Sequence, residues 1–201
     1  MNKGLMIVIS GPAGSGKGTV NAHLLATDEF VYSVSATTRA PRPGEVDGVN
    51  YHFITRQEFI QRINSDGMLE YTEYCGNYYG TPKKEAEEVL RSGKNLILEI
   101  EVEGAKNIKK KYPDAVLILL LPPSFSVQER RLRARGTESE EKILERLTRT
   151  REEIKEAYAY DYIVYNYDGA DKVAAAEIQA IVNAEKHAMR RNADTVNEYF
   201  S

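Results

Sequence analysis

The chain has 201 residues, of which 42% are hydrophobic and 28% are charged, with a formal net charge of -3 at pH 7. These values predict one globular domain with a core of its own, and they give no positive field that would favour nucleic acid or an anionic membrane. No apolar stretch approaches the ~20 residues of a membrane span, and the apolar run near residue 5 is too short for a signal peptide. The single cysteine, Cys75, excludes an internal disulfide framework. We therefore expect a soluble protein of a reducing compartment, the cytoplasm.

The first predicted element is a buried strand that leads through a glycine-rich turn into a helix. Residues Leu5–Ile9 are all apolar, and a helical pattern begins at Lys17. Between them, residues 11–17 have the G-x-x-x-x-G-K spacing of a phosphate-binding loop. The glycines allow backbone N–H groups to point inward, the helix adds its positive end, and Lys17 supplies a full charge. Gly18 stands where Ser or Thr usually holds magnesium, and Thr19 follows it, a variant that resembles nucleoside monophosphate kinases. The alternative is a glycine-rich turn without a ligand.

The segment from about Ser35 to Thr81 lacks the strand–helix rhythm of the rest and is predicted to be a small β-rich insert. Within it and at its edges we expect β-type stretches over residues 30–35, 49–55 and 68–74, a polar loop over 36–48, a helix over 56–64 and a turn over 75–77. Residues 78–82 are expected to lead into a helix over Lys83–Ser92, which Gly93 ends.

The alternation of strands and helices returns after this segment. We expect strands over residues 95–101, 115–121 and 162–165, and helices over 102–112, 124–135, 139–158 and 170–191. Residues 192–201 give no strong signal and are expected to fray or pack loosely. Continuous apolar strands between helices predict an α/β fold, a parallel sheet covered on both faces. Because ligands bind at the carboxyl ends of such strands, the phosphate loop is expected to meet Ser35, Arg39, Glu99 and Glu101 there.

The chain as a whole resembles the guanylate kinases, which transfer a phosphoryl group from ATP to GMP. The matching motifs extend from the first strand to the basic helices, and they are Gly11–Thr19, Val34–Arg42, Gly48–Phe53, Gly76–Thr81, Glu99–Glu101 and Arg135–Glu138. The resemblance implies a P-loop kinase core formed by residues 1–34, 82–124 and 158–191. It further implies a GMP-binding insert at about 35–81, a short helical lid at about 125–157, and a tail over 192–201.

The resemblance also implies an ATP site. The phosphates are expected on Gly11, Pro12, Ala13, Gly14, Ser15, Gly16, Lys17, Gly18 and Thr19. Arg131 is expected near the adenine, while Arg135 and Arg146 close over the triphosphate and neutralise the transferring group, as an arginine finger does. The alternative is that these arginines are solvated and paired with nearby glutamates. Mg²⁺ accompanies ATP, and Glu99 is the acid best placed to orient one of its waters; a purely structural role for Glu99 at the strand end remains equally open.

A cradle for the phosphate of GMP is expected from four residues of the insert. Arg39, Arg42, Tyr51 and Tyr79 supply two planar guanidinium groups and two phenol hydroxyls, which suit a phosphate dianion. Arg42 is also counted, with Lys17, among the groups that stabilise charge during transfer. The alternative is a solvated loop with incidental arginines and tyrosines that pack in the core.

A reader for the guanine base is expected opposite the phosphate loop. Ionised Glu70 can accept the adjacent N1–H and N2–H₂ donors of guanine, and the hydroxyls of Ser35 and Thr81 suit the O6 edge. By resemblance Glu101 belongs to the same set, although the shorter Asp is expected there. Without these neighbours, Glu70 would be interpreted as a solvated acid on a strand.

Two other classes of function stay open at this point. A binding module with the same fold would keep protein partners instead of nucleotides, but such modules typically lose the phosphate-loop residues that are intact here, Lys17 among them. A related kinase could act on another phosphorylated acceptor such as a ribose bisphosphate, and adenylate kinase shares the Gly11–Thr19 loop without the insert. We expect ATP, GMP and dGMP as ligands in purine nucleotide metabolism and GMP recycling, with neither nucleic acid nor a membrane as partner; the sequence does not fix the oligomeric state.

Overall fold

The structure, a computed structural model, describes residues 3–74, 76–136 and 139–200. Its larger sheet has five parallel strands in the order β2-β7-β1-β8-β9. These are β1 (Met6–Ser10), β2 (Phe30–Tyr32), β7 (Asn95–Leu98), β8 (Val116–Leu121) and β9 (Tyr162–Tyr165). The central strand β1 is buried along its whole length, as a strand covered on both faces must be. The predicted fold class, a parallel sheet with helices on both faces, is confirmed.

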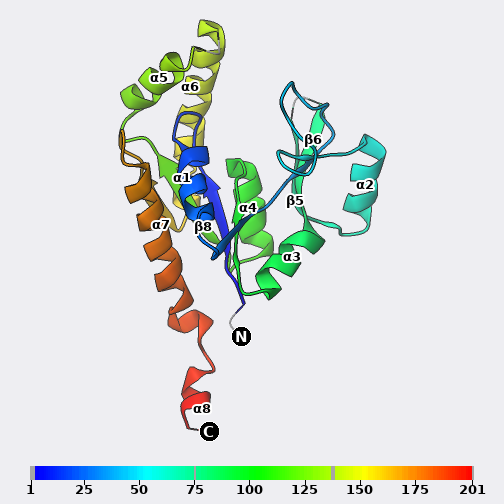
Figure 1. The fold of residues 1–201 in the computed structure, drawn as a ribbon, viewed down its shortest axis with the longest axis vertical. Helices are drawn as coiled ribbons and strands as arrows, with labels where there is room; N and C mark the ends of the chain where they lie inside the picture. The colour runs from blue at the N-terminus through cyan, green and yellow to red at the C-terminus, as the bar shows by residue number, and fades with distance from the viewer. Residues whose placement is uncertain (1–2, 75, 137–138, 201) are drawn as a thin grey trace.

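Helices cover both faces of the main sheet (Figure 1), and alternate side chains of β1 pack against different helices. Ile7 and Ile9 belong to the core under α1 (Lys17–Leu25) and α7 (Asp171–Lys186). Met6 and Val8 face the opposite way, toward α3 (Lys83–Arg91) and α4 (Val102–Lys111). This two-residue alternation is the side-chain period of a strand, and it gives the molecule two cores on the two faces of one sheet.

A second, smaller sheet has the strand order β4-β3-β6-β5 and mixes parallel and antiparallel pairs. Its strands are β3 (Ala36–Thr37), β4 (His52–Phe53), β5 (Met68–Tyr74) and β6 (Asn77–Pro82), and helix α2 (Arg56–Asn64) packs against them. Phe59 of α2 is fully buried and stacks on Tyr78 of β6, with 5.2 Å between the ring centroids. Figure 1 shows this sheet to one side of the main one, and helices α3 and α4 contact both sheets.

Three predictions for this segment were wrong in detail. Residues 77–82 form a strand rather than a turn and a lead-in to a helix, because β6 pairs with both β3 and β5. The polar loop contains β3, and the strand expected over 49–55 is limited to His52–Phe53. The turn expected at 75–77 includes Cys75, which lies outside the described residues.

Two helices stand above the carboxyl end of the main sheet, α5 (Phe125–Ala134) and α6 (Glu140–Lys155) (Figure 1). Each begins at a serine whose side chain accepts a hydrogen bond from the backbone N–H three residues later, Ser124 in α5 and Ser139 in α6. Helix α6 ends before the predicted residue 158, and a 3₁₀ turn, η1 (Ala157–Ala159), follows.

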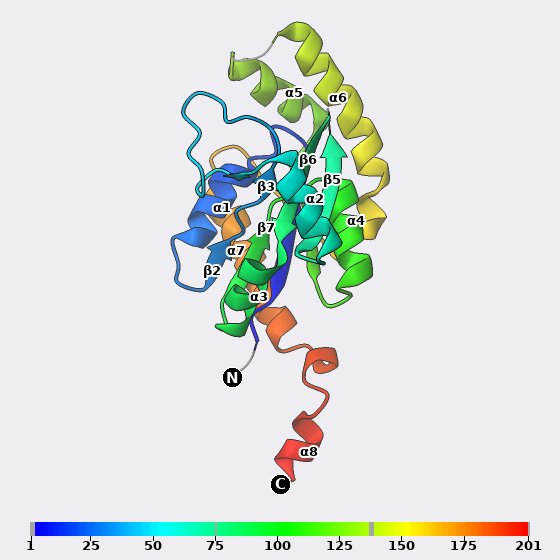
Figure 2. The ribbon, with the colours of Figure 1, turned by 90° about the vertical axis from the view of Figure 1, so that its right-hand side faces the viewer.

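The C-terminal part is more structured than predicted. Helix α7 ends at Lys186 rather than at Arg191, and it is followed by the 3₁₀ turn η2 (Met189–Arg191) and by α8 (Thr195–Tyr199), which falls in the expected fraying tail. Helix α8 extends away from the body of the molecule (Figures 1 and 2), and Tyr199 and Phe200 are exposed. Within the described ranges, the structure contains no helix whose length and apolar character would let it span a bilayer.

Candidate active site

The turn between β1 and α1 has the geometry of an anion-binding loop. Gly14 and Gly16 have φ values of +86° and +90°, a backbone conformation that residues other than glycine rarely adopt. A Cβ at Gly16 would lie 2.2 Å from Nδ2 of Asn166, so only glycine fits there. The Nζ of Lys17 donates to the carbonyl oxygens of Gly11, at 2.6 Å, and Pro12, at 3.4 Å. The ammonium group is thereby folded back over the loop.

Three acidic side chains from other parts of the fold act on the charge of the Lys17 ammonium group. Burial lowers the pKa of Lys17, and the nearby carboxylates of Glu99, Glu101 and Glu153 act in the opposite direction. Glu99 follows β7 directly, and its Oε2 accepts a hydrogen bond of 2.9 Å from Nδ2 of Asn21 in α1. The carboxylate is therefore fixed at the carboxyl end of the sheet, beside the phosphate loop.

Glu70 lies buried between the second sheet and helix α4. Its side chain belongs to β5 and is 6% exposed, and Thr81 of β6 donates its hydroxyl to Oε1 of Glu70 at 2.9 Å. A Cβ at Gly104, in the first turn of α4, would lie 3.1 Å from Oε2 of Glu70. Because α4 starts shortly after Glu99, Glu70 lies at the same end of the main sheet as Lys17. Burial raises the pKa of Glu70 to about 7, against the hydrogen bonds from Thr81.

The structure brings the predicted phosphate cradle together in part. The Arg39 guanidinium group lies over the ring of Tyr51, 5.6 Å from its centroid, and the rings of Tyr51 and Tyr79 are 6.0 Å apart. Two nitrogens of Arg39 donate to the carboxylate of Glu45, each at 2.9 Å. The backbone N–H of Arg42 donates to the same carboxylate at 2.7 Å, while the Arg42 side chain is exposed. In this structure the Arg39 guanidinium group, which is expected to bind a phosphate, is therefore paired with the carboxylate of Glu45.

Two other predicted guanine contacts, Ser35 and Glu101, are less buried than Glu70. Ser35 is half-buried between β2 and β3, and its carbonyl accepts a 2.9 Å hydrogen bond from the backbone of His52. Glu101 is exposed at the start of α4, and its carboxylate pairs with the guanidinium group of Arg149 in α6. In this structure Glu101 therefore faces the helices above the sheet.

The arginine-bearing helix α5 is bound to the phosphate loop. The Nε and Nη2 of Arg131 donate to Oδ1 of Asp168 at 3.0 and 2.8 Å, and its Nη1 donates to the carbonyl of Gly14 at 3.3 Å. Asp168 follows the last strand, β9. These contacts border a cavity of about 360 Å³ lined by Gly14, Gly16, Thr19, Arg131, Ala134, Arg135, Asn166, Asp168, Gly169 and Asp171.

The two remaining predicted arginines of the ATP site belong to the helix pair α5 and α6. Arg135 caps α5 and lines the same cavity. Arg146 lies in α6, with its side-chain Nε buried. Thr137 and Glu138, which complete the predicted Arg135–Glu138 motif, lie outside the described residues. Among the residues with described positions, no three His, Cys, Asp or Glu side chains are grouped to hold a metal ion.

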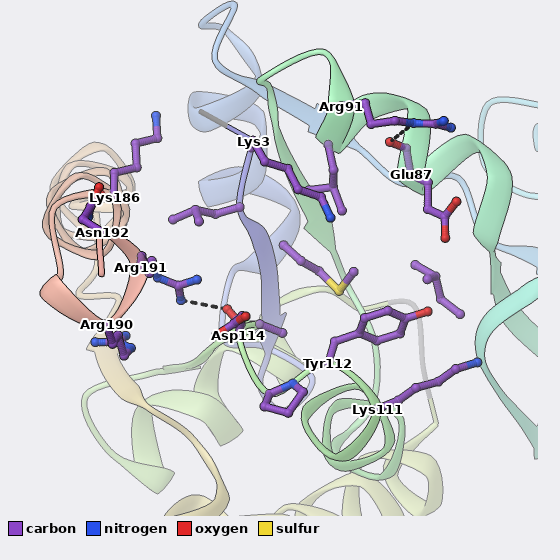
Figure 3. A pocket seen from close by; sticks show the side chains of 17 residues that line it. Lys3, Glu87, Arg91, Lys111, Tyr112, Asp114, Lys186, Arg190, Arg191 and Asn192 are labelled. Atoms are coloured by element: carbon purple, nitrogen blue, oxygen red, sulfur yellow. Dashed lines mark hydrogen bonds between the residues drawn. The ribbon is translucent and has the colours of Figure 1, made fainter. Parts of the chain in front are cut away.

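A second cavity, of about 630 Å³, lies elsewhere (Figure 3). It includes Leu5 and Met6 at the start of β1 and Ala115 just before β8, so it lies at the amino ends of the strands. Figure 3 shows Lys3, Tyr112 and Arg191 around it, none of which was predicted as a site residue. This larger cavity therefore lies at the end of the sheet opposite the phosphate loop.

Several residues of the site belong to no recognisable sequence motif, so they were not predicted from the sequence. Glu45 is an acid in a polar loop, and Gln128 in α5, whose amide donates to the Ala13 carbonyl of the phosphate loop at 3.0 Å, is a polar residue in a charged helix, so neither stands out. Asn166 and Asp168 could have been found, because they directly follow the last predicted strand and ligands gather at the carboxyl ends of parallel strands.

A phosphate loop on a parallel sheet, with an arginine-bearing helix pair over it and the buried Glu70–Thr81 pair at the same end of the sheet, is the arrangement of the nucleoside monophosphate kinases. The family model for guanylate kinase matches residues 3–185. The chain belongs to the guanylate kinase family.

Individual relatives agree with this assignment over nearly the whole chain. A guanylate kinase of Carboxydothermus hydrogenoformans is 46% identical over 187 residues, covering 92% of this chain and 91% of that protein. One of Halalkalibacterium halodurans is 51% identical over 184 residues, covering 91% of this chain and 89% of that protein. The crystal structure of the guanylate kinase from Anaplasma phagocytophilum, at 32% identity, superposes with a TM-score of 0.75 and covers 95% of this chain and 90% of that one.

Proposed function

We propose that this protein transfers the γ-phosphoryl group of ATP to GMP, giving ADP and GDP, and that it also accepts dGMP. The observation that carries the proposal is the buried Glu70–Thr81 pair at the same end of the sheet as Lys17. In this proposal the carboxylate of Glu70 binds the guanine base of GMP, and the phosphate loop binds the triphosphate of ATP. Membership of the guanylate kinase family supports the same substrates.

Base selection follows from the donor pattern of guanine. Its N1–H and N2–H₂ groups both donate, and an ionised Glu70 has two oxygens to accept them. Adenine turns an acceptor toward this carboxylate, which would leave buried polar groups unpaired. Mismatches of this kind give discrimination of about 10⁴ to 10⁵. The hydroxyls of Thr81 and Ser35 then complete the polar wall of the guanine pocket.

The transfer itself needs positioning and charge neutralisation more than proton chemistry. The attacking phosphate oxygen of GMP is already anionic near neutral pH, so no general base is required. Arg39, Tyr51 and Tyr79 orient that phosphate, while Lys17 holds the outer phosphates of ATP. Arg135 and Arg146 from α5 and α6, together with Arg42, offset the negative charge that spreads over the transferring group.

Magnesium fits this site as a companion of ATP rather than as a resident ion. Glu99 presents a hard oxygen donor beside the phosphate loop, held by Asn21, and Thr19 adds a hydroxyl at the start of α1. These residues would hold the waters of a magnesium–nucleotide complex. When bound, the ion shields the β- and γ-phosphates and so favours attack on the terminal phosphorus.

The fold supports a division of labour among its parts. Residues of about 35–81 bind GMP, those of about 125–157 cover ATP, and the remainder forms the core. Closure of the two flanking parts when both nucleotides are bound would exclude water and limit wasteful ATP hydrolysis. The single cysteine supports a reducing compartment, and we place the enzyme in the cytoplasm, in purine nucleotide metabolism and GMP recycling.

The test is a comparison of acceptors. ATP and Mg²⁺ are supplied with GMP, dGMP, AMP or ribose 1,5-bisphosphate, and ADP release is measured. We expect rapid turnover with GMP and dGMP and turnover slower by about 10⁴ with AMP. The Glu70→Gln variant should lose most GMP turnover, whereas Glu73→Gln, an exposed acid on the same strand, should retain it. Preference of the wild type for AMP or for the sugar would overturn the proposal.

A further inference from the structure

Three consecutive carbonyl groups of the phosphate loop are bound by side chains from outside it. The carbonyl of Ala13 accepts from Nε2 of Gln128 at 3.0 Å, and that of Ser15 accepts from Nδ2 of Asn166 at 3.0 Å. The carbonyl of Gly14, between them, accepts from Arg131 at 3.3 Å. Gln128 and Asn166 are each 1% exposed, so neither bond competes with solvent.

These bonds fix the direction of the loop's N–H groups. In a trans peptide the C=O and the following N–H point in opposite directions. If Gln128 holds the Ala13 carbonyl outward, the N–H of Gly14 must face the inside of the loop. Asn166 does the same for the N–H of Gly16. A carbonyl that turned inward would instead repel the phosphate, so the outer bonds preorganise the anion site.

Gln128 also reaches the second helix above the sheet. Its Nε2 donates a further hydrogen bond, at 2.7 Å, to Oγ1 of Thr150 in α6. The hydroxyl of Thr150, a residue 4% exposed, then donates to the carbonyl of Arg146 one turn earlier, at 2.9 Å. A single buried chain of hydrogen bonds therefore runs from the phosphate loop to the backbone of Arg146.

Apolar packing surrounds this chain and keeps it dry. Leu132 of α5 and Ile143 and Leu147 of α6 form one small core, and Ala13 of the loop packs against it. In such surroundings an unpaired carbonyl is costly, which makes the orientation of the loop strongly dependent on the Gln128 amide.

We propose that Gln128 is a positioning residue for the ATP site. It holds the phosphate loop in its anion-binding conformation and, through Thr150, sets helix α6 and Arg146 at a fixed place relative to that loop. The inference rests on the proposed ATP-dependent transfer, and it adds a residue that contacts neither the reacting phosphates nor the base. It also implies that the parts of α5 and α6 around Gln128 and Thr150 keep a fixed position relative to the phosphate loop.

The test compares four variants with the wild type. Gln128→Met keeps the length of the side chain and removes the donor, and Thr150→Val removes the hydroxyl. Thr150→Ser retains the hydroxyl. Thr148→Val is the matched control, because Thr148 in the same helix makes the same backbone bond, to Leu144 at 2.9 Å, but on the exposed surface. The readouts are kcat, KM for ATP, KM for GMP and thermal unfolding.

We expect Gln128→Met and Thr150→Val to raise KM for ATP or lower kcat by about tenfold in total, the effect of losing one buried hydrogen bond. KM for GMP should stay within about twofold, Thr150→Ser should restore the wild-type values, and Thr148→Val should match the wild type. Folded variants with unchanged kinetics would overturn the proposal, and so would an equal rise in both KM values.

A second measurement separates this inference from the proposed function. Calorimetric titration of the free protein with Mg²⁺–ADP reports the phosphate loop without any transfer. Gln128→Met should weaken this binding by about tenfold, and Thr148→Val should not. If the wild type binds Mg²⁺–ADP but transfers nothing to GMP, the proposed function fails while the positioning role is still tested. Equal affinity of the wild type and Gln128→Met would overturn the positioning role alone.

Discussion

In the proposed guanine site, the protonation of Glu70 should decide how well GMP binds. Burial raises its pKa to about 7, so a large fraction of the free protein carries a neutral carboxyl at neutral pH. A neutral carboxyl keeps one O–H donor and cannot accept both guanine donors. Binding of GMP should therefore draw a proton off Glu70 and lower its pKa.

The first prediction concerns the pH dependence of this step. KM for GMP should rise as the pH falls from 8 to 6, while KM for ATP changes little, since Glu70 is ionised above its pKa of about 7 and neutral below it. The phosphate of GMP also titrates near pH 6. Glu70→Gln shares that titration, so the difference between its profile and that of the wild type isolates the carboxylate. Parallel profiles would contradict the assignment of Glu70.

The second prediction concerns charge neutralisation. Arg135→Ala should lower kcat by at least about a hundredfold with little change in thermal unfolding, because an arginine over the transferring group acts mainly in the transition state. Arg133→Ala is the control, since Arg133 lies on the same helix and pairs with Glu129 and Glu140 at the surface. Near-normal turnover of Arg135→Ala would show that its charge acts elsewhere.

At the scale of residues, the sequence indicates the charged groups of the site more readily than the groups that hold them. Lys17 belongs to a spaced motif, and Glu70 gains meaning from the chemistry of guanine. Gln128 and Glu45 have no such signal, because their roles depend on contacts across 115 residues in one case and on the shape of a polar loop in the other. How Glu101 meets the base stays a prediction.

At the scale of elements, both the backbone conformation and the packing of the phosphate loop require glycine at one position. Gly16 has a φ of +90° and lies against Asn166, whereas a methyl group added at Gly18, two residues later in α1, would meet nothing within 4 Å. The two glycines are neighbours in one motif and yet have opposite steric requirements.

The third prediction uses this contrast. Gly16→Ala should lower the free energy of unfolding by about 1–3 kcal/mol and abolish binding of Mg²⁺–ADP, because the added methyl group needs a strained backbone and displaces Asn166. Gly18→Ala should be neutral or stabilising, by up to about 1 kcal/mol, since alanine is the better helix former. Chemical denaturation and calorimetry would measure both. Similar effects of the two substitutions would contradict the described loop geometry.

Elements with a clear hydrophobic period were the ones that the sequence could predict. Helix α2 and strands β5 and β9 have the predicted bounds, and the core strands lie within a residue or a few of theirs. Strand β6 was missed because its Asn, Gly and Pro residues are typical of turns. Its pairing with β3 and β5 supplies the backbone hydrogen bonds that local sequence does not indicate.

At the scale of the whole molecule, one buried acid fastens the C-terminal end of α7 to the body. Glu185 is 2% exposed and accepts from the hydroxyl of Tyr162 in β9 at 2.6 Å and from Arg191 at 2.7 Å. Arg191 also donates to the carbonyl of Asp114 at 2.7 Å (Figure 3). Although burial by itself would raise the pKa of Glu185, these hydrogen bonds and that of Arg190 lower it to about 2.

The fourth prediction follows from this lowered pKa. The group contributes stability that is fully present above its unfolded-state pKa of about 4.3 and is lost as the pH falls through about 2. Glu185→Gln should therefore reduce the free energy of unfolding at pH 7 by up to about 3 kcal/mol, and the difference from the wild type should vanish near pH 2. Glu177→Gln, an exposed acid on the same helix, should have little effect at any pH. A constant difference across the pH range would contradict the ionic role.

The place of β1 in the sheet has a consequence for how the chain is made. This strand leaves the ribosome before its neighbours, β7 and β8, which begin about 90 and 110 residues later. At ribosomal rates of about 5–20 residues per second, it waits several seconds, or longer, without partners. Nascent chains halted before residue 95 should therefore be open to proteases and chaperones, and protection should begin only after residue 121 has emerged.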